Sequence, residues 1–406
     1  MSSRPRLVVQ KYGVSVRDVR GIVNVCRRIK RAVESGQRIV AVISSLGQDT
    51  DDLAELAFRI KGGMAKPAAR ELDMLMASGE ATTAPLVAIG LQGMGVWAVA
   101  LSGLQAGIET DAAYGSAEVL RVRPLRVRRA LEAGIVPVVA GFQGATEDLD
   151  VTTLGRGGGD VTAVRLAAEL GADQCEIYVS YQGIRTADPH LVPDARVLSH
   201  ITYEEALELS NTGLHMWQPR AVELARQFHV PVHLRPVGRP DGGTRIVEEV
   251  PELMKRTVCA IGHQDGIGQI RVAGVPDRPG AGADLLEPLS ACDITANVIS
   301  HTAGCGLSFI VRESELDEAL RAVAPAARAI GASATAVSDV VEVSAVGTGM
   351  HGGSGVAARM FRTLADHGIA IETVASSDIR ITCIIRRRHQ ASAVRALHDA
   401  FGLSQP

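Results

Sequence analysis

Aromatic residues are scarce in this sequence: Phe, Trp and Tyr make up 3% of the 406 residues, although 46% of all residues are hydrophobic. The cores must therefore be built from Ala, Val, Leu and Ile, the usual content of parallel sheets covered by helices. The length exceeds one ordinary domain and suits two or three.

A strong excess of either charge is also lacking. The chain has 42 basic and 45 acidic residues and a formal net charge of −3. This balance argues against nucleic acid or an anionic membrane as a partner, and we expect neither.

Long apolar stretches are missing as well. No run approaches the roughly 18 apolar residues that a membrane span needs, and the first residues, Met-Ser-Ser-Arg-Pro-Arg, contain no apolar signal segment. The six cysteines are scattered, without the CxxC spacing of a metal site. We therefore expect a cytoplasmic protein with no bound metal. The cysteines, expected as buried free thiols, are Cys26, Cys175, Cys259, Cys292, Cys305 and Cys383.

Short apolar runs alternate with helical periods through the first 250 residues, which predicts one α/β domain over 1–250. Its sheet should be open and mostly parallel, with helices on both faces and ligands beyond the carboxyl ends of the strands. The expected strands are 7–10, 39–44, 96–102, 135–140, 175–179 and 232–234. The expected helices are 17–35, 51–60, 70–94, 124–133, 161–170, 202–211 and 219–228.

An internal repeat follows a turn-rich segment at 239–244. The pattern from Gly280 to Ile294 returns from Gly355 to Ile369, an offset of 75 residues, and in both copies a glycine opens an amphipathic helix. Each copy continues with a strand and a second helix, the order of a small α+β ferredoxin-like βαββαβ module. We expect these modules at 262–335 and 336–406.

A glycine-rich turn, Leu154-Gly-Arg-Gly-Gly-Gly-Asp160, lies between an expected strand and the expected helix 161–170. Glycines let backbone N–H groups converge on an anion at the start of a helix, where the helix dipole favours negative charge. Arg156, which we expect to be buried, adds a fork suited to a carboxylate or phosphoryl oxygen. A glycine run alone is weak evidence, because such turns also use glycine for purely steric reasons.

Several motifs, in order and at matching spacing, give the chain a family resemblance. They are Gln10-Lys-Tyr-Gly13, Val42-Ile-Ser-Ser-Leu-Gly47 with Thr50-Asp-Asp-Leu53, Arg70-Glu-Leu-Asp-Met-Leu75 with Ser78-Gly-Glu80, Ala140-Gly-Phe-Gln-Gly144 and Thr152-Thr-Leu-Gly-Arg-Gly-Gly158. On these residues the chain resembles the aspartate kinases, members of the amino-acid kinase superfamily that end in a pair of ACT regulatory domains. The resemblance covers nearly the whole length.

The resemblance implies transfer of the γ-phosphoryl group of ATP to the β-carboxylate of L-aspartate, with MgATP used if the protein is active and no firmly bound cofactor. This reaction depends on positioning and charge neutralisation. The resemblance assigns the aspartate pocket to Ser44, Thr50, Glu80 and Arg156, and the catalytic roles to Lys11 and Asp160. It assigns the nucleotide phosphates to Gly13, Gly155, Gly157 and Gly158.

The nucleotide half departs from the family pattern. The opening loop, K-F/Y-G-G-T/S-S-V in the family, is here one residue shorter, and Val14 replaces its second glycine. The segment Val179-Ser-Tyr-Gln-Gly-Ile-Arg-Thr-Ala-Asp-Pro-His190 lacks the family's two acidic residues, at Ser180 and Gln182. His215 stands where the family has a phosphate-binding lysine, and Gly159 replaces a serine.

These departures leave three alternatives: an ordinary aspartate kinase, an impaired or inactive aspartate-binding protein that acts as a regulatory partner of an active aspartate kinase, and altered chemistry on a similar amino acid. Losing one preorganised donor typically costs about 10²–10³ in rate, so several losses predict weak, altered or absent activity. Arg185 and a protonated His215 are the candidates for compensating charge at the nucleotide.

The repeat region diverges too. The family's effector loop D-x-P-G is retained at Asp277–Gly280, but Asn297 replaces an effector-pairing carboxylate and His301 stands near the usual Gln. Asp277, Gly280, Asn297 and His301 are therefore the candidate effector residues, for lysine or threonine. The competing interpretation, which we favour slightly, is a dimerisation platform without a ligand. In either case we expect a homodimer or larger oligomer.

Overall fold

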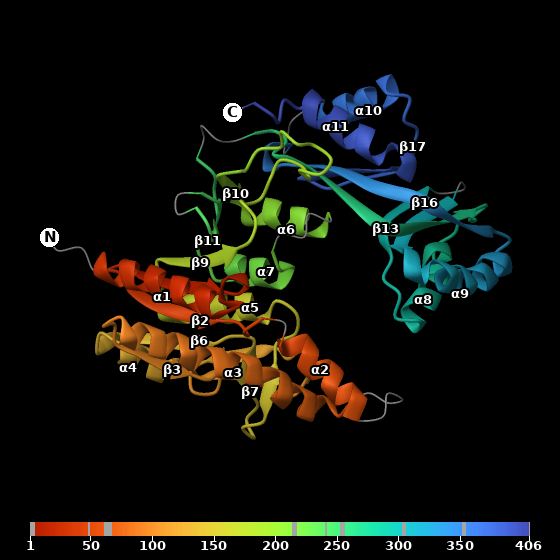
Figure 1. Ribbon diagram of the computed structural model, residues 1–406. Coiled ribbons are helices and arrows are strands. Elements are labelled where there is room, and N and C mark those ends of the chain that lie inside the picture. Colours follow the sequence, from red (N-terminus) through yellow and green to blue (C-terminus); the bar gives the residue numbers. More distant parts are fainter. Residues whose placement is uncertain are drawn as a thin grey trace. The chain divides into compact units, whose positions relative to one another are not determined.

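The computed structural model describes residues 5–47, 49–60, 67–212, 217–239, 242–251, 256–302, 306–350 and 355–405 (Figure 1). Contacts between Cα atoms divide the chain into two compact units. The first unit contains Met1–Ile184, Ser199–Tyr203 and Trp217–Val250, and the second contains Arg185–Leu198, Glu204–Met216 and Pro251–Pro406.

An eight-stranded sheet forms the centre of the first unit, in the order β10-β12-β11-β9-β1-β2-β6-β3. Its pairs are parallel, except that β11 and β12 are antiparallel. The strands are β1 (Leu7–Tyr12), β2 (Arg38–Ile43), β3 (Ala98–Leu101), β6 (Val136–Ala140), β9 (Gln174–Val179), β10 (His200–Thr202), β11 (Val232–Pro236) and β12 (Thr244–Val247). The six strands expected from the sequence are all present, which confirms the open, mostly parallel sheet.

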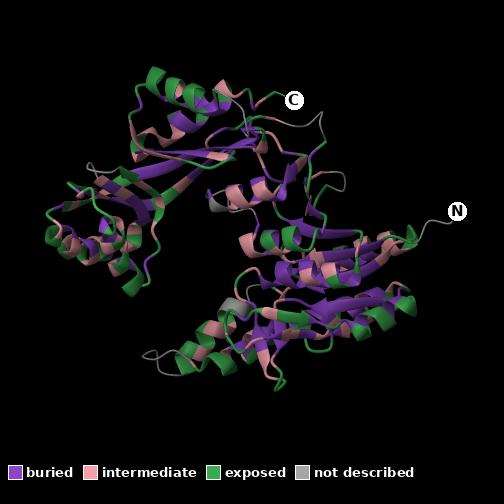
Figure 2. Ribbon diagram, turned by 180° about the vertical axis from the view of Figure 1, so that it is seen from behind, coloured by how far each residue is buried: buried purple, intermediate pink, exposed green. Residues whose placement is uncertain are grey.

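Helices lie on both faces of this sheet. The helices are the 3₁₀ turn η1 (Val14–Val16), α1 (Val19–Glu34), α2 (Asp49–Ile60), α3 (Ala69–Gly93), α4 (Leu125–Glu132), α5 (Gly158–Leu170) and α7 (Pro219–Gln227). Helix α6 (Tyr203–Asn211) belongs to the second unit, apart from its first residue. Successive side chains of β1 point to opposite faces of the sheet and so contact different helices. Val8 and Tyr12 join a core with Ile22 and Val25 of α1, whereas Lys11 points to the face that α5 covers. Most of the sheet is buried (Figure 2).

A second, four-stranded sheet was not expected from the sequence. It has the order β5-β4-β7-β8 and consists of β4 (Ile108–Thr110), β5 (Val119–Val122), β7 (Gln143–Ala145) and β8 (Val151–Thr153). These strands have only three or four residues, too few to show a period in the sequence. The sheet matters because β8 leads directly into the glycine-rich turn.

Helix α3 bears on the expected lack of a membrane-spanning stretch. It is long enough to cross a membrane, and an 18-residue window in it has a mean hydropathy of 1.3. Within that window 44% of the residues are buried inside the protein, and the helix carries two buried carboxylates, Asp73 and Glu80. These features are those of a core helix in a folded domain.

The second unit contains a six-stranded antiparallel sheet in the order β14-β15-β13-β16-β18-β17. Its strands are β13 (Ala260–Ala273), β14 (Asn297–Thr302), β15 (Gly306–Arg312), β16 (Ser333–Val346), β17 (Ile371–Ser376) and β18 (Arg380–Arg386). Its helices are α8 (Ala281–Ala291), η3 (Glu313–Glu315), α9 (Leu316–Ala329), η4 (Thr348–Met350), α10 (Val356–Asp366), η5 (Arg387–His389) and α11 (Gln390–Ala400).

The internal repeat has equivalent geometry in its two copies. Gly280 and Gly355 are both left-handed N-caps, with φ of 88° and 108°, and Ile294 and Ile369 are both buried. Each of the long strands β13 and β16 contributes residues to both copies of the repeat. The first half of β13 pairs with the second half of β16, so it supplies the last strand of the second copy, which ends with α11.

Most of the expected buried thiols are confirmed. Cys26, Cys175, Cys259 and Cys383 are free and buried, while Cys292 is free but exposed, because it follows the last turn of α8. Cys305 lies outside the described residues.

Candidate active site

The glycine-rich turn joins β8 to α5, and the helix begins at Gly158, three residues earlier than expected. The turn needs glycine because Gly155 and Gly157 have φ of 74° and 78°, a region that side chains disfavour. A Cβ on Gly158 would lie 2.8 Å from Leu154 Cβ, so glycine also allows close packing there. The first turn of α5 is buried, so the positive end of the helix dipole lies at an enclosed site, although the Gly158 and Asp160 N–H groups already donate to the Gly155 and Gly157 carbonyls.

Lys11 and Asp160 form an ion pair at this helix start. The distance from Lys11 Nζ to Asp160 Oδ1 is 2.8 Å, and the two side chains are only 15% and 12% exposed. The two expected catalytic residues are therefore in contact. An ammonium beside a helix N-terminus is suited to phosphoryl oxygens, and here the Asp160 carboxylate balances its charge.

Ser44 and two glycines surround the Lys11 side chain. A Cβ on Gly13 would lie 2.8 Å from Lys11 Nζ and 3.4 Å from Ser44 Oγ. A Cβ on Gly159 would lie 3.1 Å from Lys11 Cε and 3.3 Å from Ser44 Oγ. The absence of a serine side chain at Gly159 therefore leaves room for Lys11 and Ser44 in the positions seen here.

Glu80 is a buried carboxylate near these groups, although a carboxylate on a helix is ordinarily solvated. Its side chain accepts a hydrogen bond from the Ser45 backbone N–H at 3.0 Å, and Oε2 is buried without a hydrogen-bond partner among the described residues. Burial raises the pKa of Glu80 to about 7, while the nearby Lys11 ammonium lowers it. A buried acceptor without a partner suits a ligand that brings its own donor.

Arg156 corrects a sequence expectation, because its side chain is exposed. The residue lies in the turn before α5, and its carbonyl accepts a hydrogen bond from Gln218 Nε2 at 2.8 Å. Its guanidinium has no carboxylate partner among the described residues. Arg156 is thus positioned by its backbone and keeps its charge available to a ligand.

Asp73 is a buried residue of this region whose role the sequence did not reveal. It is 1% exposed and accepts hydrogen bonds from the Gly115 N–H at 2.9 Å, the Thr153 N–H at 2.7 Å and Thr153 Oγ1 at 2.8 Å. Asp73 therefore ties α3 to the strand that enters the glycine-rich turn. Its place in the Arg70–Leu75 motif, near the start of a helix, was the available signal.

Tyr181 is a second residue that the sequence reading missed. Its hydroxyl is buried and has no hydrogen-bond partner among the described residues. Burial and the Asp160 carboxylate raise the pKa of Tyr181 well above its ordinary value, so the phenol stays protonated. It lies between the substituted positions Ser180 and Gln182, both of which are exposed.

The remaining expected site residues are not brought together by the described structure. Thr50 lies in α2, but its side chain is outside the described residues, as is the whole of His215. Arg185 belongs to the second unit, where its guanidinium donates to the Ala195 carbonyl. Their roles stay predictions.

The candidate effector residues lie around α8 and β14 of the second unit. Gly280 caps α8, and Asp277 precedes it in an exposed loop. Asn297 and His301 are exposed positions of the edge strand β14, opposite Ile310 and Leu307 of β15. Their role as an effector site also stays a prediction.

Comparisons with known proteins agree with this geometry. The amino acid kinase family matches residues 6–236, and an ACT domain matches residues 343–401. An aspartokinase of Thermus thermophilus is 40% identical over 406 residues, covering 98% of this chain and 99% of the relative. An aspartokinase of Geobacillus stearothermophilus is 39% identical, covering 98% of each chain.

Solved structures show the same fold at lower identity. The aspartate kinase of Clostridium acetobutylicum has a TM-score of 0.82 at 20% identity, with 97% of this chain and 100% of that chain covered. Aspartokinase III of E. coli, in complex with aspartate and ADP, has a TM-score of 0.77 at 20% identity, with 98% and 100% covered. The expected fold and family are thereby confirmed, and the chain belongs to the aspartokinase family of amino acid kinases.

Proposed function

We propose that this chain binds L-aspartate and transfers a phosphoryl group from MgATP to the β-carboxylate of aspartate only weakly. The observation that carries the proposal is the contrast within one site. The aspartate side keeps Ser44, Glu80 and Arg156, and the Lys11–Asp160 pair is formed at 2.8 Å, whereas the nucleotide motifs are altered.

The ammonium and one carboxylate of aspartate each have a matching residue. The unpartnered Glu80 Oε2 would accept a hydrogen bond from the substrate ammonium, and the exposed Arg156 would hold a carboxylate with its fork. Lys11 would stabilise charge on the phosphoryl oxygens as the transfer proceeds, and Asp160 would keep the Lys11 ammonium in place.

The phosphates of the substrate MgATP would bind near Lys11 and the start of α5. The close approach of Gly13 to Lys11 and the enclosed start of α5 suit phosphoryl oxygens. The weakness we propose comes from other positions: Val14 in a shortened loop, Ser180 and Gln182 in place of carboxylates, and His215 in place of lysine. Each lost donor typically costs about 10²–10³ in rate.

A regulatory role is the second candidate. The strands β14 and β17 form the two edges of the sheet in the second unit, and β14 is largely exposed. An exposed edge strand can pair with another chain, so we propose a cytoplasmic homodimer or larger oligomer that could also join an active aspartokinase. A monomer in light scattering at micromolar concentration would contradict the oligomer.

Calorimetry tests aspartate binding separately from turnover. We expect saturable binding of L-aspartate by the full chain, and Arg156→Gln should weaken it by about 1.5–3 kcal/mol, the range for hydrogen bonds to charged groups. Arg20→Gln, an exposed arginine on α1 away from the proposed aspartate residues, is the matched control. Absence of binding both with and without a nucleotide would refute the proposed pocket.

A further inference from the structure

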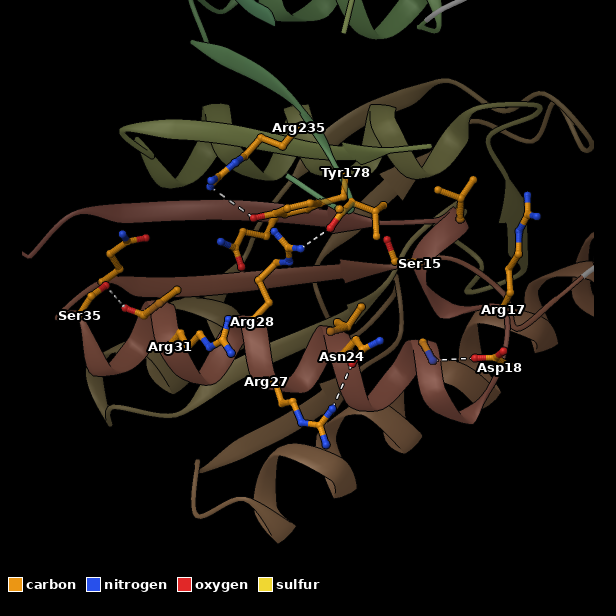
Figure 3. Close-up of a pocket in the computed structure, with 18 residues that line it drawn as sticks. Ser15, Arg17, Asp18, Asn24, Arg27, Arg28, Arg31, Ser35, Tyr178 and Arg235 are labelled. Carbon is orange, nitrogen blue, oxygen red and sulfur yellow. Dashed lines mark hydrogen bonds between the residues drawn. The ribbon is translucent and has the colours of Figure 1, made fainter. Parts of the chain in front are cut away.

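A groove of about 850 Å³ lies in the first unit between α1 and the strands β1, β9 and β11 (Figure 3). Its lining is strongly basic. It contains five arginines, Arg17, Arg27, Arg28, Arg31 and Arg235, and one carboxylate, Asp18. In Figure 3 the residues of α1 lie on one side of the groove, and Tyr178 and Arg235 lie on the other.

The carboxylates near the groove are already engaged. Asp18 is the N-cap of α1 and accepts a hydrogen bond from the Gly21 N–H at 2.6 Å. Glu176 forms an ion pair with Arg235 at 2.8 Å and accepts hydrogen bonds from Gln10 and Tyr178. Net positive charge therefore remains along the helix.

Part of this charge follows one face of α1. Asn24, Arg28, Arg31 and Ser35 are spaced by four, three and four residues, so they share a helical face. Arg28 and Arg31 have no carboxylate within ion-pair distance among the described residues. Neighbouring like charges on a helix are unfavourable by themselves, and a bound anion would relieve this repulsion.

Arg28 is held in place before any ligand arrives. Its guanidinium donates to the Val237 carbonyl at 2.5 Å and lies 4.6 Å from the centre of the Tyr178 ring. The same ring stacks on Tyr12 of the neighbouring strand β1, with ring centroids 4.5 Å apart, and Arg235 of β11, on its other side, lies 5.7 Å from the ring centre. Both ring faces are covered, so Tyr178 offers no surface for stacking a nucleobase, and the groove is suited to recognising charge.

The loop before α1 supplies a neutral donor. Ser15 Oγ is buried and has no hydrogen-bond partner among the described residues, and Ser15 lines the groove. The loop packs tightly on the helix, because a Cβ on Gly21 would lie 2.3 Å from the Ser15 carbonyl oxygen. A hydroxyl beside several guanidinium groups is a favourable combination for oxyanions.

We propose that this groove binds a small anion with two or more negative groups, such as a diphosphate or triphosphate. Arg28 and Arg31 would form forked hydrogen bonds to neighbouring phosphate groups, since they are about 4.5 Å apart along the helix axis. The site is distinct from the proposed aspartate site. Gln10 points into the groove, while its neighbour Lys11 points to the opposite face of β1, toward Asp160.

Titration calorimetry of the full chain with inorganic tripolyphosphate tests this inference. We expect a saturable site at which Arg31→Gln, at an exposed position without an internal partner, weakens binding roughly tenfold. Arg28→Gln should have a similar effect. Arg20→Gln carries the same charge change on the same helix outside the groove and should bind like the unaltered chain. Thermal unfolding of each variant checks that the fold is retained.

A second control separates the groove from the kinase site. Any tripolyphosphate bound at the kinase site should be lost in Lys11→Gln, whereas the Arg31-dependent site should keep its affinity, because Lys11 is not in the groove. The inference is overturned if the unaltered chain does not bind, if Lys11→Gln rather than Arg31→Gln removes binding, or if Arg20→Gln weakens it equally. It is also overturned if an oligoglutamate peptide saturates the groove and tripolyphosphate does not, since the partner would then be an acidic protein segment.

Discussion

Lys11 Nζ lies 2.8 Å from Asp160 Oδ1, and this contact joins the strand β1 to the first turn of α5. The two residues are 149 positions apart in the sequence. Their pairing brings the opening K-Y-G motif to the glycine-rich turn, so the two residues assigned to phosphoryl transfer lie together.

Replacing Lys11 by Met should reduce both turnover and stability. Asp160 would be left as a mostly buried carboxylate without its counter-charge, which should cost roughly 1–3 kcal/mol after allowing for its partial exposure. Urea unfolding measures this loss. Lys30→Met is the control, because its ion pair with Glu34 is 37% and 56% exposed and should contribute little. Equal losses in the two variants would contradict a special role for the Lys11–Asp160 pair.

Aspartate binding should depend on pH through Glu80. Burial raises the pKa of this carboxyl to about 7, so at pH 6 it is mostly protonated and cannot attract the substrate ammonium as an anion. Affinity should therefore rise as the pH increases from 6 to 8, by up to about tenfold per unit below the pKa. Calorimetry at several pH values tests this, and Glu80→Gln should remove the dependence. A flat profile in the unaltered chain would exclude Glu80 as the ammonium acceptor.

The same group affects the stability of the free protein in the opposite direction. The folded pKa of about 7 lies above the ordinary value of about 4.3. The folded protein holds the protonated Glu80 carboxyl more tightly than the unfolded chain does. The stability that this gives is complete below the unfolded pKa and is lost as the pH rises through 7. Urea unfolding without aspartate measures this effect. Between pH 5 and pH 8 the free energy of unfolding should fall less in Glu80→Gln than in the unaltered chain.

Asp73→Ala should weaken the region that presents the glycine-rich turn. The change leaves the N–H groups of Gly115 and Thr153 without their acceptor, which typically costs about 1–3 kcal/mol for a buried donor. Aspartate affinity should fall as well, because β8 leads into the turn. Glu71→Ala, at an exposed position on the same helix, should change unfolding by less than about 0.5 kcal/mol. Unaltered binding in Asp73→Ala would show that the turn does not need this anchor.

The substitution His215→Lys alone should not give strong turnover, because the opening loop stays one residue short and keeps Val14. A combined variant, with a glycine inserted after Gly13 and His215→Lys, should be more active than either change alone. Steady-state rates of aspartyl phosphate formation measure the difference. Full activity of the His215→Lys variant would place the whole defect at that residue.

The sequence was sufficient for the long elements of the fold. Strands such as β1 and β2 are continuous apolar runs, and α1 has a clear amphipathic period that begins after Asp18. The strands β4, β5, β7 and β8 were missed because their three or four residues pair across the chain, and such pairing leaves no local period. The start of α5 was placed too late because glycine is a poor helix former, yet Gly158 and Gly159 form its first turn.

The candidate site was predictable in its residues but not in its geometry. The motifs named Lys11, Asp160, Ser44 and Glu80, and the structure brings these close together or buries them in the first unit. The exposure of Arg156 depends on the direction of a turn, and the burial of Tyr181 depends on tertiary packing. Local sequence patterns therefore predict neither the exposure of Arg156 nor the burial of Tyr181.

Trapping of aspartyl phosphate with hydroxylamine tests the central claim most directly. The purified chain, with saturating MgATP and L-aspartate, should form hydroxamate at roughly 10²-fold or more below an active aspartokinase assayed in parallel. Lys11→Met should remove what activity remains. Hydroxamate formation at the rate of the active enzyme would contradict the proposal and show an ordinary aspartate kinase.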